Sequence, residues 1–305
     1  MNVMFPPDHA SLTGLARGSF RLEDLSPEPN DPPTTAVPRP REGLFAVIHV
    51  DAREARLLIA RRTADGAFQT LRQEHEIFNL GPRGLEDPGQ LVIDLANVLS
   101  RFQRLTELLG ATVRAVATPS FLALPDCARL RERLWRVTRV PLQVISDREV
   151  ARFVCMGVLS GRPPGHRSVL LDVGDHSTSI IFASATDPLA MWQLPLGTAR
   201  LAVLSGVKAR HPDHVRTVSW RQQIKDTLSA GHLDAIRGNA HDAILLRPRA
   251  WGAPPPRHHC ADLVSAATAV LLDEVATYLG IRNTQASDSG LSEGVLVELS
   301  VTAAA

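Results

Sequence analysis

The chain contains 305 residues, of which 44% are hydrophobic, so it is long enough for two domains with sizeable cores. A formal net charge of +1 argues against a surface dedicated to nucleic acid or to a membrane. The three cysteines, Cys127, Cys155 and Cys260, lie far apart, which favours a reducing compartment over a disulfide framework. No secretory leader opens the sequence and no uncharged apolar run approaches about 20 residues, so we expect a cytoplasmic protein without a membrane span.

Residues 1–42 differ in composition from the rest, because eight prolines stand among charged and small residues. Proline lacks a backbone donor and disfavours a helical conformation in the residue before it, so this region is predicted to be a disordered, flexible extension. Its short piece Ala10–Leu25 is a candidate for a partner-binding helix, with a solvated tail as the alternative.

The pattern becomes globular from Gly43. Leu44–Val50 and Ala55–Ala60 are predicted to form a hairpin, followed by a helix over residues 87–110 and a strand over Val113–Ala117. A helix over Cys127–Val137 and a strand over Leu142–Ile145 follow. Five arginines of that helix region are interpreted as a solvated basic face rather than a track for a polyanion: Arg129, Arg131, Arg133, Arg136 and Arg139.

The stretch Ser168–Ser184 carries the clearest chemical signal. Two β-like runs flank a loop of small and polar residues: Gly174, Asp175, His176, Ser177 and Thr178. The first run delivers a carboxylate, Asp172, to this loop. Loop amides and hydroxyls can face a phosphate while the acid faces its metal, although an ordinary hairpin with a polar turn has the same pattern. Further on, a helix over Ala261–Leu279 and a closing strand over Gly294–Leu299 are predicted.

Five segments, in order along the chain, resemble the exopolyphosphatase and guanosine-pentaphosphate phosphohydrolase (Ppx/GppA) family. FAVIHVDAREARLLIAR (Phe45–Arg61) is similar to its first phosphate loop, D-L-G-S-N-S-F-R-L, and LLDVGDHSTSIIF (Leu170–Phe182) to its second, D-I-G-G-G-S-T-E. VISDREVARFVCMGV (Val144–Val158) resembles I-S-G-E-E-E-A-R-L-x-x-x-G-V. QLPLGTARL (Gln193–Leu201) resembles S-L-P-L-G-x-x-R-L, and SDSGLSEGVLVEL (Ser287–Leu299) resembles S-D-x-G-L-R-E-G-V-L.

This resemblance implies an α/β protein of the actin-like ATPase fold, with two ribonuclease-H-like lobes around a cleft. The expected division is an extension over residues 1–42, a first lobe over 43–158 and a second lobe over 159–305. Cleft ligands in such folds bind at the carboxyl ends of strands, where Asp51 and Asp172 are expected to emerge.

The resemblance also assigns roles to individual residues. It places the phosphate at Gly174, Asp175, His176, Ser177 and Thr178 in the second loop and at Asp51 and Arg53 in the first. Asp172 falls on the family's metal- or water-contacting aspartate, and the metal is Mg²⁺. Glu149, next to the position of the water-activating glutamate, is the remaining candidate for a catalytic carboxylate.

Several family positions have changed chemistry. The water-activating glutamate falls on Val150, and the first-loop aspartate falls on His49. Two second-loop glycines have become Asp175 and His176. In the first loop, Asp51 and Glu54 bring negative charge to where an anion is expected. Ser179 replaces a second acid, and Leu122 replaces an arginine.

We therefore expect a catalytically impaired family member, a pseudoenzyme with a ligand-binding or regulatory role. The first alternative is an active Mg²⁺-dependent exopolyphosphatase that releases the terminal phosphate of polyphosphate or guanosine pentaphosphate. The second is a partner-binding scaffold, and an actin-like ATPase or sugar kinase ranks last. The expected ligands are polyphosphate or a guanosine tetra- or pentaphosphate, without nucleic acid or membrane partners, and the sequence leaves a homodimer open.

Overall fold

The computed structural model describes residues 43–51, 54–78, 88–124, 127–174, 177–197, 214–231, 233–246 and 260–303. By its internal contacts the chain divides into a unit over Met1–Val37 and a unit over Pro38–Ala305, and the description concerns the second unit. The predicted extension over 1–42, with its candidate helix, lies outside the described residues, as do Arg53, Asp175 and His176. Among the helices that are described, none has the length and apolar character needed to cross a membrane.

The first sheet has five strands in the order β3-β2-β1-β4-β5. These are β1 (Leu44–Val50), β2 (Glu54–Arg62), β3 (Phe68–Ile77), β4 (Thr112–Ala117) and β5 (Gln143–Val144). The first three strands pair antiparallel, and β4 and β5 continue the sheet parallel to β1. Along the chain, helix α1 (Pro88–Leu109) connects β3 to β4. A short 3-10 turn, η2 (Pro119–Ala123), and helix α2 (Cys127–Thr138) connect β4 to β5.

The second sheet repeats this topology in the order β8-β7-β6-β9-β10. Its strands are β6 (Arg167–Val173), β7 (Thr178–Ser184), β8 (Asp187–Leu194), β9 (Asp242–Leu246) and β10 (Asn283–Ser287). Again three strands pair antiparallel and two continue parallel to the first of them. Helix α5 (His214–Ala230), the turn η3 (Leu233–Ile236) and helix α6 (Cys260–Leu279) complete this half. The two mixed sheets with flanking helices confirm the predicted pair of ribonuclease-H-like lobes.

Alternate residues of each central strand face two different cores, as expected of strands buried on both sides. Ala46, Ile48 and Val50 of β1 belong to the core that α1 and α2 cover, whereas Phe45 and Val47 belong to a core built with α3 and α7. Helix α3 (Asp147–Leu159) also covers the inner face of the second sheet. The outer face of that sheet packs against α5 and α6.

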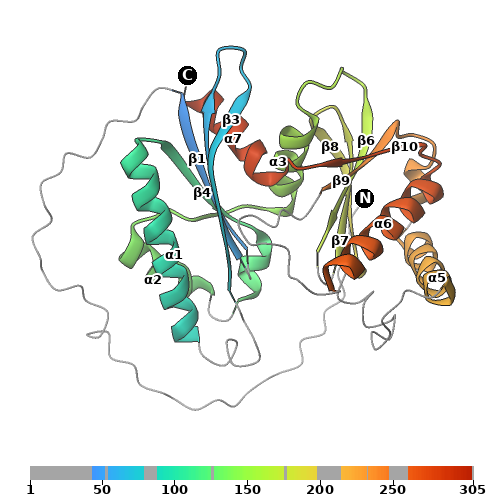
Figure 1. The fold of residues 1–305 in the computed structure, drawn as a ribbon, viewed down its shortest axis with the longest axis horizontal. Helices are drawn as coiled ribbons and strands as arrows, with labels where there is room; N and C mark the ends of the chain where they lie inside the picture. Colours follow the sequence, from blue (N-terminus) through green and yellow to red (C-terminus); the bar gives the residue numbers. More distant parts are fainter. Residues whose placement is uncertain are drawn as a thin grey trace, which may run out of the picture. The chain divides into compact units, whose positions relative to one another are not determined.

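The C-terminal helix α7 (Leu291–Thr302) packs on β1 and β2, although the chain reaches it only after the second sheet. It lies alongside α3, which in turn packs on β8 (Figure 1). Each sheet is therefore covered on its inner face by one of two helices that contact each other. The predicted division of the chain at 158/159 stays a prediction.

The prediction of a closing strand over Gly294–Leu299 is wrong, because this segment lies inside α7. A short apolar run rich in valine fits a buried strand and a buried helix equally well. The deciding signal is at the start of the helix, where the backbone N–H of Gly290 donates to Oε2 of Glu293 over 2.8 Å. This bond satisfies a donor that the helix leaves unpaired, so it favours helix initiation at Leu291.

Two glycines allow α3 and α7 to approach each other at backbone distance. A Cβ on Gly294 would lie 1.7 Å from the carbonyl oxygen of Phe153, and a Cβ on Gly157 would lie 2.1 Å from that of Gly290. Neither position tolerates a side chain unless the helices separate. The helix crossing therefore depends on glycine at both positions.

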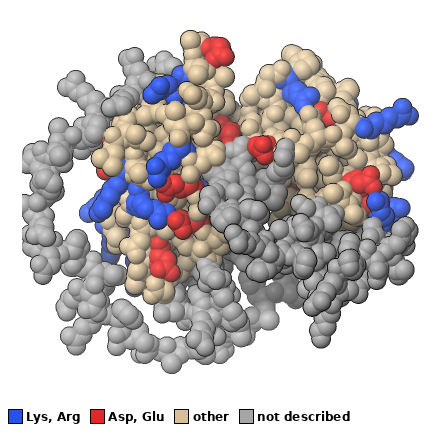
Figure 2. Space-filling view, in the orientation of Figure 1, with Lys and Arg blue, Asp and Glu red and all other residues tan. Residues whose placement is uncertain are grey.

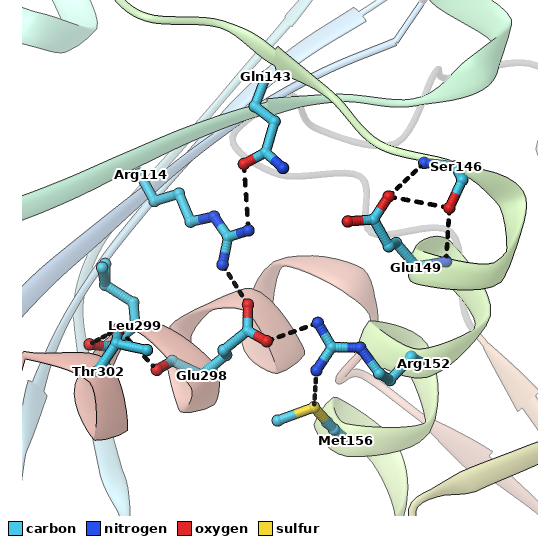
Figure 3. A network of polar contacts seen from close by, with 9 residues as sticks. All are labelled: Arg114, Gln143, Ser146, Glu149, Arg152, Met156, Glu298, Leu299 and Thr302. Carbon is cyan, nitrogen blue, oxygen red and sulfur yellow. Dashed lines mark hydrogen bonds and ion pairs between the residues drawn. The ribbon is translucent and has the colours of Figure 1, made fainter.

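A polar network joins the same two helices to the first sheet (Figure 3). Glu298 of α7 accepts from Arg152 of α3 over 2.5 Å and also accepts from Arg114 of β4. The guanidinium groups of Arg152 and Arg114 lie 4.5 and 5.3 Å from the ring centroid of Phe153. Burial raises the pKa of Glu298, but the hydrogen bonds and charges of the two arginines outweigh it and lower the pKa overall. The carboxylate is thus held ionised between two cations.

Gly294→Ala should destabilise the protein by about 3 kcal/mol, because the helices must separate to admit the methyl group and both inner cores then loosen. Urea unfolding followed by circular dichroism measures this change. Gly290→Ala is the matched control, since a Cβ there would meet nothing within 4 Å. Equal stability of the two variants would contradict a backbone contact between α3 and α7.

Candidate functional site

The central hairpins of the two sheets have equivalent turns. In the β1–β2 hairpin the N–H of Asp51 donates to the carbonyl of Glu54 over 2.8 Å, and in the β6–β7 hairpin the N–H of Gly174 donates to that of Ser177 over 2.9 Å. Asp51 thus occupies the position of Gly174. His49 is the last but one residue of β1 and pairs with Arg56, and Asp172 is the last but one residue of β6 and pairs with Ser179. His49 is therefore the counterpart of Asp172.

Both of these residues lie on the inner faces of their sheets. His49 continues the alternation of Phe45 and Val47, whose core includes α3 and α7 residues. Asp172 continues the alternation from Leu170, whose core includes α3 residues. The charges of Arg56, Asp51 and Glu54 all act on Asp172. The structure therefore brings the ends of the two hairpins within electrostatic reach of each other, and we define these hairpin ends as the candidate site.

Asp172 has a raised pKa, first because the surrounding protein desolvates its carboxylate, with Arg56 opposing the shift and Asp51 and Glu54 adding to it. By surface area the same side chain is exposed. A carboxylate can be exposed by surface area and still be partly desolvated when it meets water on one side and protein on the others. The upward direction holds because desolvation and two nearby carboxylates act in the same sense against a single cation.

His49 is neutral at physiological pH. Burial, followed by the charge of Arg56, lowers its pKa from 6.5 to about 4, although Asp51 and Glu54 oppose the shift. Only 9% of the residue is exposed, and its Nε2 has no hydrogen-bond partner among the described residues. A buried, unpaired ring nitrogen is costly unless water or a ligand satisfies it.

Arg56 was not identified as a functional residue from the sequence. Its guanidinium lies 2.5 Å from Glu54, whose other carboxylate oxygen is 2.7 Å from Nε2 of His75. Burial raises the pKa of Glu54, but the hydrogen bond from His75 and the charge of Arg56 lower it overall. Within the described residues, Arg56 supplies the positive charge at the candidate site. The sequence feature that could have identified it is the arginine of the first-loop pattern, to which the sequence analysis assigned no role.

Asp51 is held by hydroxyl groups from the segment that follows β4. Its Oδ2 accepts from Thr118 over 3.1 Å, and its Oδ1 accepts from Ser120 over 2.8 Å. These bonds fix the carboxylate at the end of the β1–β2 hairpin. Leu122, at the position where the family has an arginine, follows in η2 and is exposed.

The predicted hydroxyl ligands of the second loop are engaged with the protein. Thr178 is buried and donates to the carbonyl of Leu196 over 2.6 Å. The Oγ of Ser177 accepts from Gln193 over 3.3 Å, and a Cβ on Gly174 would approach the Ser177 carbonyl to 3.2 Å. Thr178 therefore has a structural bond, while Gly174 keeps the turn narrow; their role in phosphate binding stays a prediction.

Glu149 caps the helix on which it lies. Its Oε2 accepts from the backbone N–H of Ser146 over 2.7 Å and from the Ser146 hydroxyl over 2.9 Å, and its own N–H donates back to that hydroxyl over 3.3 Å. Figure 3 shows the carboxylate turned back onto Ser146. These bonds lower its pKa, and the charges that act on it are those of Arg152 and Arg114 rather than those around Asp172. The role of Glu149 and Asp172 as a catalytic pair stays a prediction.

Val150, at the position of the family's water-activating glutamate, packs against both inner cores. The described residues offer no group of three or more histidine, cysteine, aspartate or glutamate side chains arranged to hold a metal ion. The expectation that Asp172 contacts a magnesium ion stays a prediction.

Two lobes of repeated topology, with equivalent central hairpins whose ends lie within electrostatic reach of each other, define a protein of the actin-like ATPase fold. The model of the Ppx/GppA phosphatase family matches residues 58–228, more than half of the chain, so the chain belongs to this family.

Solved structures have the same fold. The type II variant structure of the Ppx/GppA phosphatase from Aquifex aeolicus is 17% identical and superposes with a TM-score of 0.70 over 84% of this chain and 98% of that one. An exopolyphosphatase from Cytophaga hutchinsonii is 17% identical, with a TM-score of 0.64 over 85% of this chain and 98% of that one. At such identities the likeness establishes the fold and leaves the activity of this chain to its own residues.

The neutral state of His49 makes stability depend on pH. Its folded pKa lies below the unfolded value, so the unfolded chain takes up the proton first as pH falls through 6.5 towards about 4. This contribution is fully present above pH 6.5 and is lost below it. Urea unfolding at about pH 7 and about pH 4.5 gives the free energy of unfolding that each protein loses as the pH falls. We expect this loss to be about 2–3 kcal/mol smaller in His49→Gln than in the wild type. His241→Gln, at an exposed histidine, should retain the wild-type dependence, and identical pH profiles of all three proteins would refute the assignment.

Proposed function

We propose that this chain is a Ppx/GppA family protein that binds a phosphorylated ligand without hydrolysing it efficiently, and that it has a regulatory role. The observation that carries this proposal is the pair Glu149 and Val150. The position of the family's catalytic carboxylate is an apolar side chain packed between two cores, and the adjacent carboxylate closes a capping box.

Hydrolysis of a phosphoanhydride needs a positioned water, a base that receives its proton, and positive charge on the phosphoryl oxygens. Asp172 is the remaining acid of the family pattern, and Ser179, its cross-strand neighbour, replaces the second one. Losing a general base alone typically costs about 100- to 10,000-fold in rate. Breaking the Ser146–Glu149 capping box to free Glu149 would also remove bonds that start α3.

The ligands we propose are polyphosphate or a guanosine tetra- or pentaphosphate. Arg56 can offer its guanidinium to a phosphate, since its Nε is buried without a partner among the described atoms, as is Nε2 of His49. Asp51 and Asp172 oppose an isolated anion, so the affinity for a single phosphate should be low. The alternatives remain an active Mg²⁺-dependent exopolyphosphatase and a partner-binding scaffold.

A coupled phosphate assay with polyphosphate and added Mg²⁺ should detect no release above that of Asp172→Ala. Val150→Glu should recover less than about tenfold, because the new carboxylate would lie among apolar neighbours and the second acid is still missing. Val150→Gln controls for the change in size and polarity. Metal-dependent release that disappears in Asp172→Ala would establish the exopolyphosphatase instead.

Guanosine tetraphosphate at about 100 times its dissociation constant should raise the melting temperature by several degrees, because it binds the folded state alone. Arg56→Gln should abolish this shift, and Arg148→Gln, at an exposed arginine of α3, should keep it. If neither guanosine tetraphosphate nor polyphosphate shifts the melting temperature of the wild type, the scaffold alternative replaces ligand binding.

A further inference from the structure

The β1–β2 hairpin ends in a carboxylate at the point where the equivalent hairpin of the second sheet has a glycine. Asp51 and Gly174 occupy the same position, because each donates its backbone N–H across the turn of its own hairpin. A glycine leaves the backbone bare for a close approach, whereas an aspartate places two acceptor oxygens there. The two halves of the candidate site therefore present different chemistry to a ligand.

The Asp51 carboxylate is fixed in place by neighbouring hydroxyl groups. Its Oδ2 accepts from Thr118 over 3.1 Å and its Oδ1 from Ser120 over 2.8 Å, and the two hydroxyl oxygens lie 2.7 Å apart. An ionised carboxylate accepts at about four lone-pair positions, so these bonds leave acceptor capacity on both oxygens. The residue is half-buried, so part of it meets solvent. Asp51 is therefore a rigid acceptor with room for a donor from a ligand.

Negative charge predominates at the two hairpin ends. Residues 49–56 and 172–179 together contain four acids and two arginines, a net charge of −2 with histidine neutral. Of the two arginines, Arg56 already forms an ion pair with Glu54 over 2.5 Å. The chain as a whole carries +1, and on the face that Figure 2 shows basic and acidic side chains lie beside one another. Consecutive phosphates of an inorganic polyanion are therefore repelled at the hairpin ends.

A second unsatisfied group lies close to Asp51 along the chain. His49 precedes Asp51 by two residues, and the charge of Asp51 acts on its ring. Only 9% of His49 is exposed, yet its Nε2 has no hydrogen-bond partner among the described residues. A hydroxyl both donates and accepts, so a ligand with neighbouring hydroxyls can donate to Asp51 and pair with this nitrogen. A phosphate chain offers acceptor oxygens, which the carboxylate cannot use.

We propose that Asp51 is a specificity-determining residue that accepts a hydrogen bond from a hydroxyl of the ligand, so that the site takes a phosphorylated sugar, such as a ribonucleotide, in preference to inorganic polyphosphate. This inference rests on the proposed function for the phosphate contact at Arg56, and on Asp51 for the choice between ligands. Carboxylates recognise ribose hydroxyls in other nucleotide-binding folds, because the hydroxyl donates to a charged oxygen. The second hairpin has no such contact to offer at the equivalent point, since Gly174 lacks a side chain.

Three triphosphates test this choice of ligand: guanosine triphosphate, its dideoxy analogue without ribose hydroxyls, and inorganic tripolyphosphate. The two nucleotides share their base and their charge, so a difference between them reports the hydroxyls alone. Isothermal titration calorimetry is done with a metal chelator present. The wild type should bind guanosine triphosphate about 10-fold or more tightly than the dideoxy analogue, because the analogue lacks a hydrogen bond to a charged group. Tripolyphosphate should bind more weakly than guanosine triphosphate.

Two substitutions of Asp51 and one control assign the preference to its carboxylate. Asp51→Ala should bind the two nucleotides with equal affinity, and it should bind tripolyphosphate more tightly than the wild type does, because one negative charge is gone. Asp51→Asn keeps the shape of the side chain and should retain a smaller preference, since an amide oxygen is a weaker acceptor. Asp226→Ala, at an exposed acid of α5, should keep the full preference. Thermal unfolding without ligand checks that each variant is folded.

Arg56→Gln separates this inference from the proposed function, because it should lose affinity for all three ligands, whereas Asp51→Ala loses the preference alone. Absence of binding of all three ligands to the wild type contradicts the proposed function and this inference together. Equal affinity of the wild type for the two nucleotides, or an unchanged preference in both Asp51 variants, overturns the role of Asp51 and leaves the phosphate contact at Arg56. A preference that appears only with added Mg²⁺ overturns the direct contact with a hydroxyl.

Discussion

The backbone contact between α3 and α7 is the constraint on which the rest of the structure depends. Gly157 and Gly294 let the two helices approach until a single methyl group would overlap a carbonyl oxygen. With the helices at this distance, each covers the inner face of one sheet, and the ends of the two central hairpins come within electrostatic reach. Glu298 then fastens the pair to β4 through Arg114 and Arg152. The site is thus set by the helix crossing before any ligand is considered.

The same scaffold holds different chemistry from the one its family pattern describes. At equivalent points of the two hairpins, the first sheet carries a neutral buried imidazole and the second sheet carries a carboxylate whose pKa is raised. The acid nearest the lost base satisfies a helix start. A fold tolerates such exchanges because sheet register and inner cores depend on apolar residues, whereas catalysis depends on a few side chains at the hairpin ends.

The sequence was sufficient to predict the two hairpins, the helices over 87–110, 127–137 and 261–279, and the lobed architecture, since their patterns are local or carried by motifs. It failed at α7, where a valine-rich run has no period long enough to separate helix from strand. Strands β3 and β10 were not predicted because they are edge strands with polar, exposed residues. Arg56 was not identified because the arginine of the first-loop pattern was given no role, and its charge acts on His49, Glu54 and Asp172 only in the folded chain.

The return of α7 to the first sheet has a consequence for synthesis on the ribosome. Phe45, Val47 and Leu58 lie in a core that α7 completes with Val295, Leu296 and Leu299. Helix α3 can cover only part of this core, so these apolar side chains stay incompletely covered until α7 has been translated, and the early half meanwhile remains in a partly folded, association-prone state. Chaperones that hold exposed apolar strands would therefore act on this protein for longer than on one whose halves close independently.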